Sequence, residues 1–97
     1  MTGDASAESE AVRAWLVERT YSDDEQNVVI LVYATPDGTR YLRKERALTS
    51  FDDARDTTAA IDAEPGNLGR VDDPETREAY ASEAERMRAK HDPDDLI

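Results

Sequence analysis

The chain has 97 residues, with 23 Asp and Glu against 12 Lys and Arg, so its formal net charge at pH 7 is −11. A chain of this length builds one domain around a single thin core. Cysteine is absent, which excludes disulfides, thiolate metal sites and cysteine nucleophiles. The negative charge argues against anionic membranes as partners, and we expect a cytoplasmic protein with no membrane association.

The charge balance also predicts a dependence on salt. Like charges repel one another across the surface, and at about 1 M salt the Debye length falls to roughly 3 Å, which ends this repulsion at a distance. We therefore expect a halophilic protein that requires high salt for folding. An acidic disordered interaction protein is the alternative, and the apolar run at residues 28–34 argues against it for the middle of the chain.

The amino-terminal part divides into a tail and a first structured element. Residues 1–10 are small and acidic, and they are predicted to be a disordered tail. Residues 12–21 alternate imperfectly between apolar and polar side chains, which favours a strand. Residues 11–19 would also suit a helix.

A β-hairpin is the strongest structural prediction. Residues 28–34 are β-branched and aromatic and are expected to form the central strand. The sequence Thr35-Pro36-Asp37-Gly38 is typical of a type I turn closed by a bulge, and the partner strand then covers residues 39–46. This turn predicts that Tyr33 lies opposite Tyr41.

The segment after the hairpin allows two interpretations. Thr49-Ser50-Phe51, followed by acids, is typical of a helix start, and a helix could run to about Ala63. Residues 57–63 could instead form a short strand, because Thr and Ile favour extended structure.

The last element is a helix from Asp73, a predicted cap, and Pro74 to His91. We expect a single α+β domain over residues 11–91, in which a three-stranded antiparallel β-meander packs against one or two helices, followed by an acidic tail at residues 92–97. Four residues form a narrow stripe on this helix: Tyr80, Ala84, Met87 and His91.

The main hint of function is a cluster of bases on the predicted strand 39–46, where four bases accompany one acid in an acidic chain. Arg13 and Arg19 could extend it. The simplest interpretation is that these bases pair with carboxylates and protect an edge strand from aggregation. Binding of nucleic acid or of an acidic protein partner are the alternatives. The candidate binding patch is Arg40, Tyr41, Arg43, Lys44 and Arg46.

We predict no enzymatic activity, and hence no catalytic, cofactor or metal residues. His91 is the only histidine, and at a helix end it is expected to interact with unpaired carbonyls and the helix dipole. The acidic clusters lack the alternating acids, central Gly and terminal Glu of a calcium loop.

Three segments carry a resemblance to a known family: Trp15–Tyr21, Leu31–Gly38 and Arg40–Leu42. The chain resembles a family of small uncharacterised haloarchaeal acidic proteins, and the likeness includes residues 80–95. It implies an archaeal, salt-loving origin and carries no known activity. Our leading hypothesis is a small non-enzymatic interaction protein that binds a protein partner or a second copy of itself through its sheet. The alternative is a nucleic-acid-binding regulator that uses the basic third strand.

Overall fold

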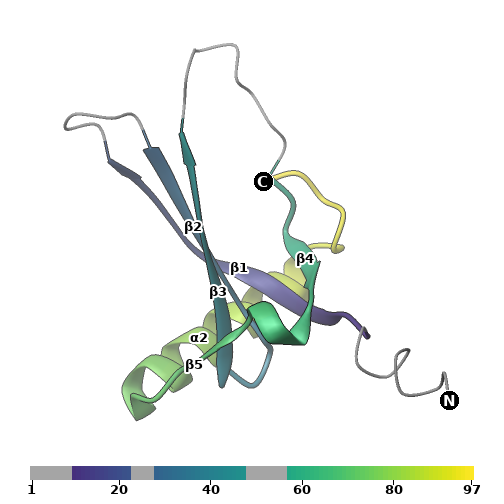
Figure 1. Cartoon of the computed structure of the whole chain (residues 1–97). Helices are drawn as coiled ribbons and strands as arrows, with labels where there is room; N and C mark the ends of the chain where they lie inside the picture. The colour runs from purple at the N-terminus through teal and green to yellow at the C-terminus, as the bar shows by residue number, and fades with distance from the viewer. Residues whose placement is uncertain (1–9, 23–27, 48–56) are drawn as a thin grey trace, which may run out of the picture.

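The computed structural model describes residues 10–22, 28–47 and 57–97. These residues form one antiparallel sheet, with strand order β4-β1-β2-β3-β5, and a helix that packs mainly on β1 (Figure 1). The elements are β1 (Val12–Ser22), β2 (Val28–Ala34), β3 (Arg40–Ala47), β4 (Ala60–Ala63), the 3-10 helix η1 (Pro65–Asn67), β5 (Gly69–Arg70) and α2 (Pro74–Lys90).

The predicted α+β class is confirmed, but the sheet is larger than the three-stranded meander that we expected. The first element is a strand, as favoured, and the strand interpretation of residues 57–63 is correct for β4. β4 pairs antiparallel with the first half of β1, and the two-residue β5 pairs with β3. The predicted helix start at residues 49–51 lies outside the described residues.

The helix α2 covers one of the two faces of the sheet. It lies on the face that Glu18 and Tyr41 share, where burial, and then the charges of Glu18 and Tyr41, raise the pKa of Tyr80. We call this the helix face, and α2 lies behind the sheet in Figure 1. The opposite face, here called the front face, carries Leu31 and Tyr33, both buried.

The strand β2 lies in the middle of the sheet and is buried on both faces. Five of its seven residues are buried, among them Leu31 and Tyr33 on the front face and Val32 and Ala34 on the helix face. β1 has an irregularity between Leu16 and Glu18 that leaves Val17 out of register. As a result, Leu16 and Arg19 both belong to the front face, opposite Tyr33 and Leu31 respectively.

The predicted register of the hairpin was wrong by one residue, since Tyr33 pairs with Leu42 rather than with Tyr41. The reason is the side chain of Asp37. Its Oδ1 accepts hydrogen bonds from the backbone N–H of Thr39 at 3.0 Å and from the hydroxyls of Thr35 and Thr39 at 2.7 and 2.8 Å. These bonds hold Thr39 in the loop, and the first closing bond runs from Thr35 N to the carbonyl of Arg40 at 3.0 Å.

The helix α2 begins and ends where the sequence predicts. Asp73 is its N-cap and accepts hydrogen bonds from the N–H and hydroxyl of Thr76 at 2.9 and 2.8 Å. Of the predicted stripe, Ala84 and Met87 are buried and join the main hydrophobic cluster together with Trp15. Most of α2 remains exposed, because only this narrow stripe faces the sheet.

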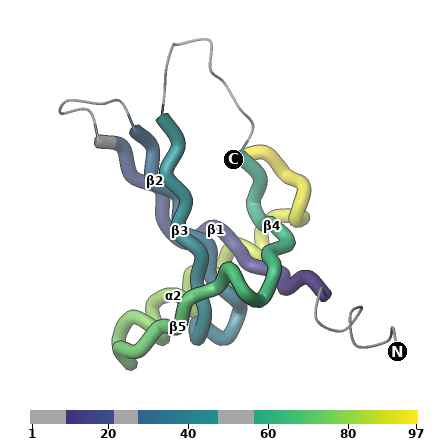
Figure 2. The backbone as a smooth tube through the Cα atoms, viewed as in Figure 1, coloured from purple at the N-terminus to yellow at the C-terminus, as the bar shows by residue number. Residues whose placement is uncertain are grey.

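Beyond α2, the chain returns to the sheet. Residues 93–97 run beside residues 57–60, as Figure 2 shows, and their backbones are joined by three hydrogen bonds. These bonds run from Ala59 N to Asp95 O, from Ala60 N to Pro93 O and from Ile97 N to Thr57 O. The segment predicted from its charges to be an acidic tail is thus hydrogen-bonded to the residues that lead into β4.

Candidate interaction surface

The structure divides the predicted binding patch between the two faces of the sheet. Alternation along β3 places Arg40, Lys44 and Arg46 on the front face, and Tyr41 and Arg43 on the helix face. The five residues therefore do not form one continuous surface.

Tyr41 has a packing role. Its ring lies against Gly69 on β5, where an added Cβ would be 2.9 Å from the ring carbon Cε1. The ring is half-buried on the helix face of the sheet, next to β5. One face of the ring is thus covered by the backbone of Gly69, and this face is closed to a stacking base.

Arg43 forms an ion pair with Glu45, two residues along the same face of β3. Both side chains are about half exposed, so the pair contributes little to stability. Its effect on the surface is larger, because it neutralises the helix face of β3.

The front face of β3 is basic. Lys44 is exposed and lies in a row with Leu31 and Arg19, whereas Arg46 donates a hydrogen bond to the hydroxyl of Thr57 at 3.5 Å. Burial raises the pKa of Tyr33, and the nearby charges of Arg46 and Arg19 oppose this rise. Arg19, which the sequence suggested as an extension of the patch, does lie on the same face as Lys44.

The outer edge of β3 is open over most of its length in the described part of the chain. β5 covers only Arg40 and Tyr41, because the turn at Pro65–Asn67 brings the chain to the sheet only at Gly69. Thr39 O accepts from Val71 N on the outer side, and Arg40 O accepts from Thr35 N on the inner side. By alternation, the backbone groups that point outward beyond β5 belong to three residues: Arg43, Glu45 and Ala47.

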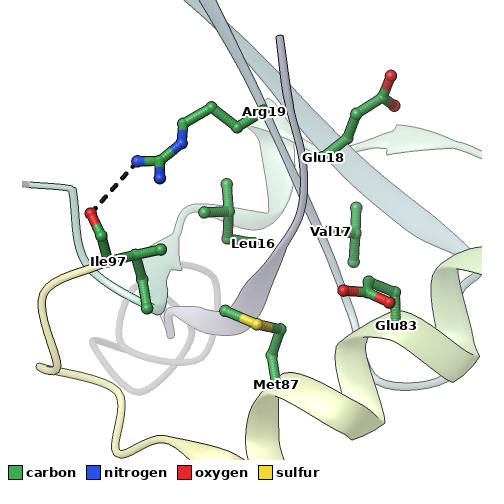
Figure 3. Close-up of a pocket in the computed structure, with 7 residues that line it drawn as sticks. All are labelled: Leu16, Val17, Glu18, Arg19, Glu83, Met87 and Ile97. Atoms are coloured by element: carbon green, nitrogen blue, oxygen red, sulfur yellow. Dashed lines mark hydrogen bonds between the residues drawn. The ribbon is translucent and has the colours of Figure 1, made fainter.

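A small pocket lies where β1 departs from register (Figure 3). It has a volume of about 160 Å³, with Leu16, Met87 and Ile97 as apolar lining and Arg19 and Glu83 at its sides. Arg19 turns away from the helix and donates a hydrogen bond to the carbonyl of Ile97 at 3.3 Å. The pocket is smaller than the roughly 300 Å³ at which sites for drug-sized ligands begin.

The remaining predicted positions also have clear places. His91 is the C-cap of α2, where its N–H donates to the carbonyl of Met87, and its Nδ1 lies 3.6 Å from a carboxylate oxygen of Asp95. Arg13 pairs with Asp62 on β4, at 2.6 Å. Among the described residues, no three His, Asp or Glu side chains are grouped so that they could hold a metal ion. No helix in these ranges is long and apolar enough to cross a membrane.

Sequence analysis missed one base at this surface. Arg70 on β5 lies directly opposite Arg40 on β3, although the two are 30 positions apart. No local pattern around Gly69-Arg70 indicates a strand, because two residues are too few to show the alternation of apolar and polar side chains that is typical of strands.

The comparisons with known proteins add a family and no activity. The model of a family of unknown function, DUF7967, matches residues 8–97. No curated protein and no solved structure matches the chain. The family match spans nearly the whole sequence and confirms that the chain resembles an uncharacterised family. The chain belongs to the family of unknown function DUF7967.

Proposed function

We propose that this protein is a non-enzymatic binding protein that accepts an extended acidic segment of a partner protein along the open edge of β3. The observation that carries the proposal is the edge itself. Arg43 and Glu45 direct backbone N–H and C=O groups away from β2, and no strand among the described residues lies beside them. Strand addition to such an edge gains affinity from main-chain hydrogen bonds and selectivity from the flanking side chains.

The charges along β3 favour an acidic partner with a particular spacing. An added strand would place every second side chain on the front face, beside Lys44 and Arg46, where carboxylates complement the bases. On the helix face its neighbours are Arg43 and Glu45, which already form an ion pair. The segment that fits best therefore has acids at alternate positions and neutral side chains between them.

A second copy of this chain fits the same edge poorly. If two β3 strands pair antiparallel about Glu45, the middle residue of the open edge, Glu45 faces Glu45 and Lys44 faces Arg46. Like charges directly opposite one another destabilise a strand pair. We therefore propose a different, acidic protein rather than a homodimer through β3.

The test compares two variants that remove the same charge. Glu45→Pro deletes an N–H that points out of the sheet, which an edge strand tolerates, whereas Glu45→Gln keeps that N–H. Fluorescence anisotropy in about 1 M KCl follows a labelled peptide of alternating Glu and Thr, and urea unfolding confirms that both variants fold. We expect E45Q to bind at least as tightly as the original protein, and E45P to bind about tenfold more weakly or worse.

Equal peptide affinities for E45P and E45Q would refute strand addition, because attraction between charges does not need the N–H. A single-stranded oligonucleotide that binds more tightly than the peptide, and equally to both variants, would favour the nucleic-acid alternative.

A further inference from the structure

Arg40 and Arg70 form a pair of like charges that the fold brings together from two distant parts of the chain. They are direct partners across β3 and β5. Arg40 O accepts from Thr35 N on the side of β2, so Arg40 and Arg70 are a pair without mutual backbone hydrogen bonds. In such pairs the Cα atoms lie only about 4.5 Å apart and the side chains are close together.

This arrangement is costly in a chain with so many available carboxylates. Like charges directly opposite in a sheet are destabilising. Four other arginines in the described ranges each pair with an acid: Arg13, Arg43, Arg86 and Arg88. The guanidiniums of Arg40 and Arg70 form no ion pair or hydrogen bond with the described residues.

Asp37, the acid whose pKa responds to the charge of Arg40, is already engaged in hydrogen bonds. Hydrogen bonds from Thr35 and Thr39 lower the pKa of Asp37, and the charge of Arg40 adds a smaller effect. Its Oδ1 holds the turn through three hydrogen bonds, and no ion pair joins Asp37 to Arg40. An external anion is therefore the group that can relieve the repulsion between the two guanidiniums.

We propose that Arg40 and Arg70 bind a doubly charged oxyanion of the phosphate monoester class. Each guanidinium presents parallel N–H donors to a pair of oxygens, and a tetrahedral dianion can accept from both side chains at once. A chloride ion offers one charge and no fixed acceptor geometry. The site goes beyond the proposed function, because Arg40 and Arg70 lie where β5 already covers the edge of β3.

The experiment follows the side-chain Nε–H signals of arginine by NMR while inorganic phosphate replaces KCl at constant ionic strength. We expect the Arg40 and Arg70 signals to move together and to saturate. Arg70→Gln should weaken phosphate binding about tenfold or more. Arg88→Gln, which removes the same charge from the exposed side of α2, should leave it unchanged.

An equal response to chloride alone, shifts that never saturate, or unchanged phosphate affinity in R70Q would each overturn the proposal. Glycerol phosphate should bind as inorganic phosphate does, and a singly charged phosphodiester more weakly; a diester that binds as tightly would overturn the assignment to monoesters. R70Q should also unfold at the same or a higher urea concentration in phosphate-free buffer, because it removes the repulsion. A clear fall would identify Arg70 as a structural residue and contradict the proposal.

Discussion

Gly38 lies in the β2–β3 turn and packs closely against the backbone of α2. Its replacement by alanine tests this contact between the sheet and the helix. Gly38 has a φ of 75°, in the left-handed region that favours glycine. A Cβ at this position would lie 2.1 Å from the carbonyl oxygen of Arg77 and 2.9 Å from the backbone nitrogen of Ala81. Both atoms belong to the backbone of α2, so no side-chain rotation can relieve the contact.

The expected loss of stability has two parts. A residue with a Cβ costs about 1 to 2 kcal/mol in the left-handed region. Forcing an extra methyl group into a packed contact costs roughly 1 to 3 kcal/mol, because the helix must move away from the turn. Together they give a decrease of about 2 to 5 kcal/mol in the free energy of unfolding, out of the 5 to 15 kcal/mol that is typical of small domains.

Urea unfolding measures this loss, with the fluorescence of the buried Trp15 as the signal. Urea is uncharged, so it leaves the electrostatic screening unchanged, and we expect the midpoint of Gly38→Ala to fall by roughly 1 M or more. Gly66→Ala is the matched control, since nothing lies within 4 Å of its added Cβ, and it should be neutral or slightly stabilising. A Gly38→Ala protein within about 0.5 kcal/mol of the original would refute the close approach of turn and helix.

Two further predictions concern charge. Hydrogen bonds from Thr35 and Thr39 lower the pKa of Asp37, and those from Thr76 lower the pKa of Asp73. Both carboxylates therefore stabilise the fold above the unfolded pKa of about 3.9. They lose this effect as the pH falls through their native pKa values. Between about pH 5 and pH 2, the urea midpoint should therefore fall less in the double variant D37N/D73N than in the original protein, and parallel pH curves would contradict the assignment. The net charge of −11 predicts a midpoint that rises with KCl between about 0.1 and 2 M, and a midpoint independent of KCl would show that repulsion does not limit folding.

Local patterns were sufficient to predict the elements whose cause is local. The apolar run of β2 needs no partner to be recognised as a strand, and the cap at Asp73 followed by Pro74 fixes the start of α2 within the sequence itself. The division of β3 into two faces follows from alternation alone.

The parts that sequence analysis missed depend on contacts between distant residues. β4 is a strand because residues 60–63 find a free edge of β1, and their own composition left helix and strand open. The register of the hairpin depends on three hydrogen bonds to one oxygen of Asp37, which turn propensities do not include. The meeting of Arg40 and Arg70 follows from where η1 returns the chain to the sheet.

The two edges of the sheet differ in what lies beside them. This difference bears on whether the charges of β3 bind a partner strand or only protect the edge from aggregation. Residues 93–97 are hydrogen-bonded to residues 57–60, where the chain enters β4, whereas beyond Tyr41 the edge of β3 carries four consecutive charged side chains, from Arg43 to Arg46. Charge protects an edge by repelling other strands, and concentrated salt weakens this repulsion. In the molar salt that we expect the protein to need, the bases of β3 would therefore give the edge little protection against pairing with other strands. Main-chain hydrogen bonds to an added strand are not screened in this way. Peptide binding that persists as KCl rises from about 1 to 2 M would therefore favour a docking role for β3. Peptide binding that disappears over this range would favour the interpretation that the charges only protect the edge.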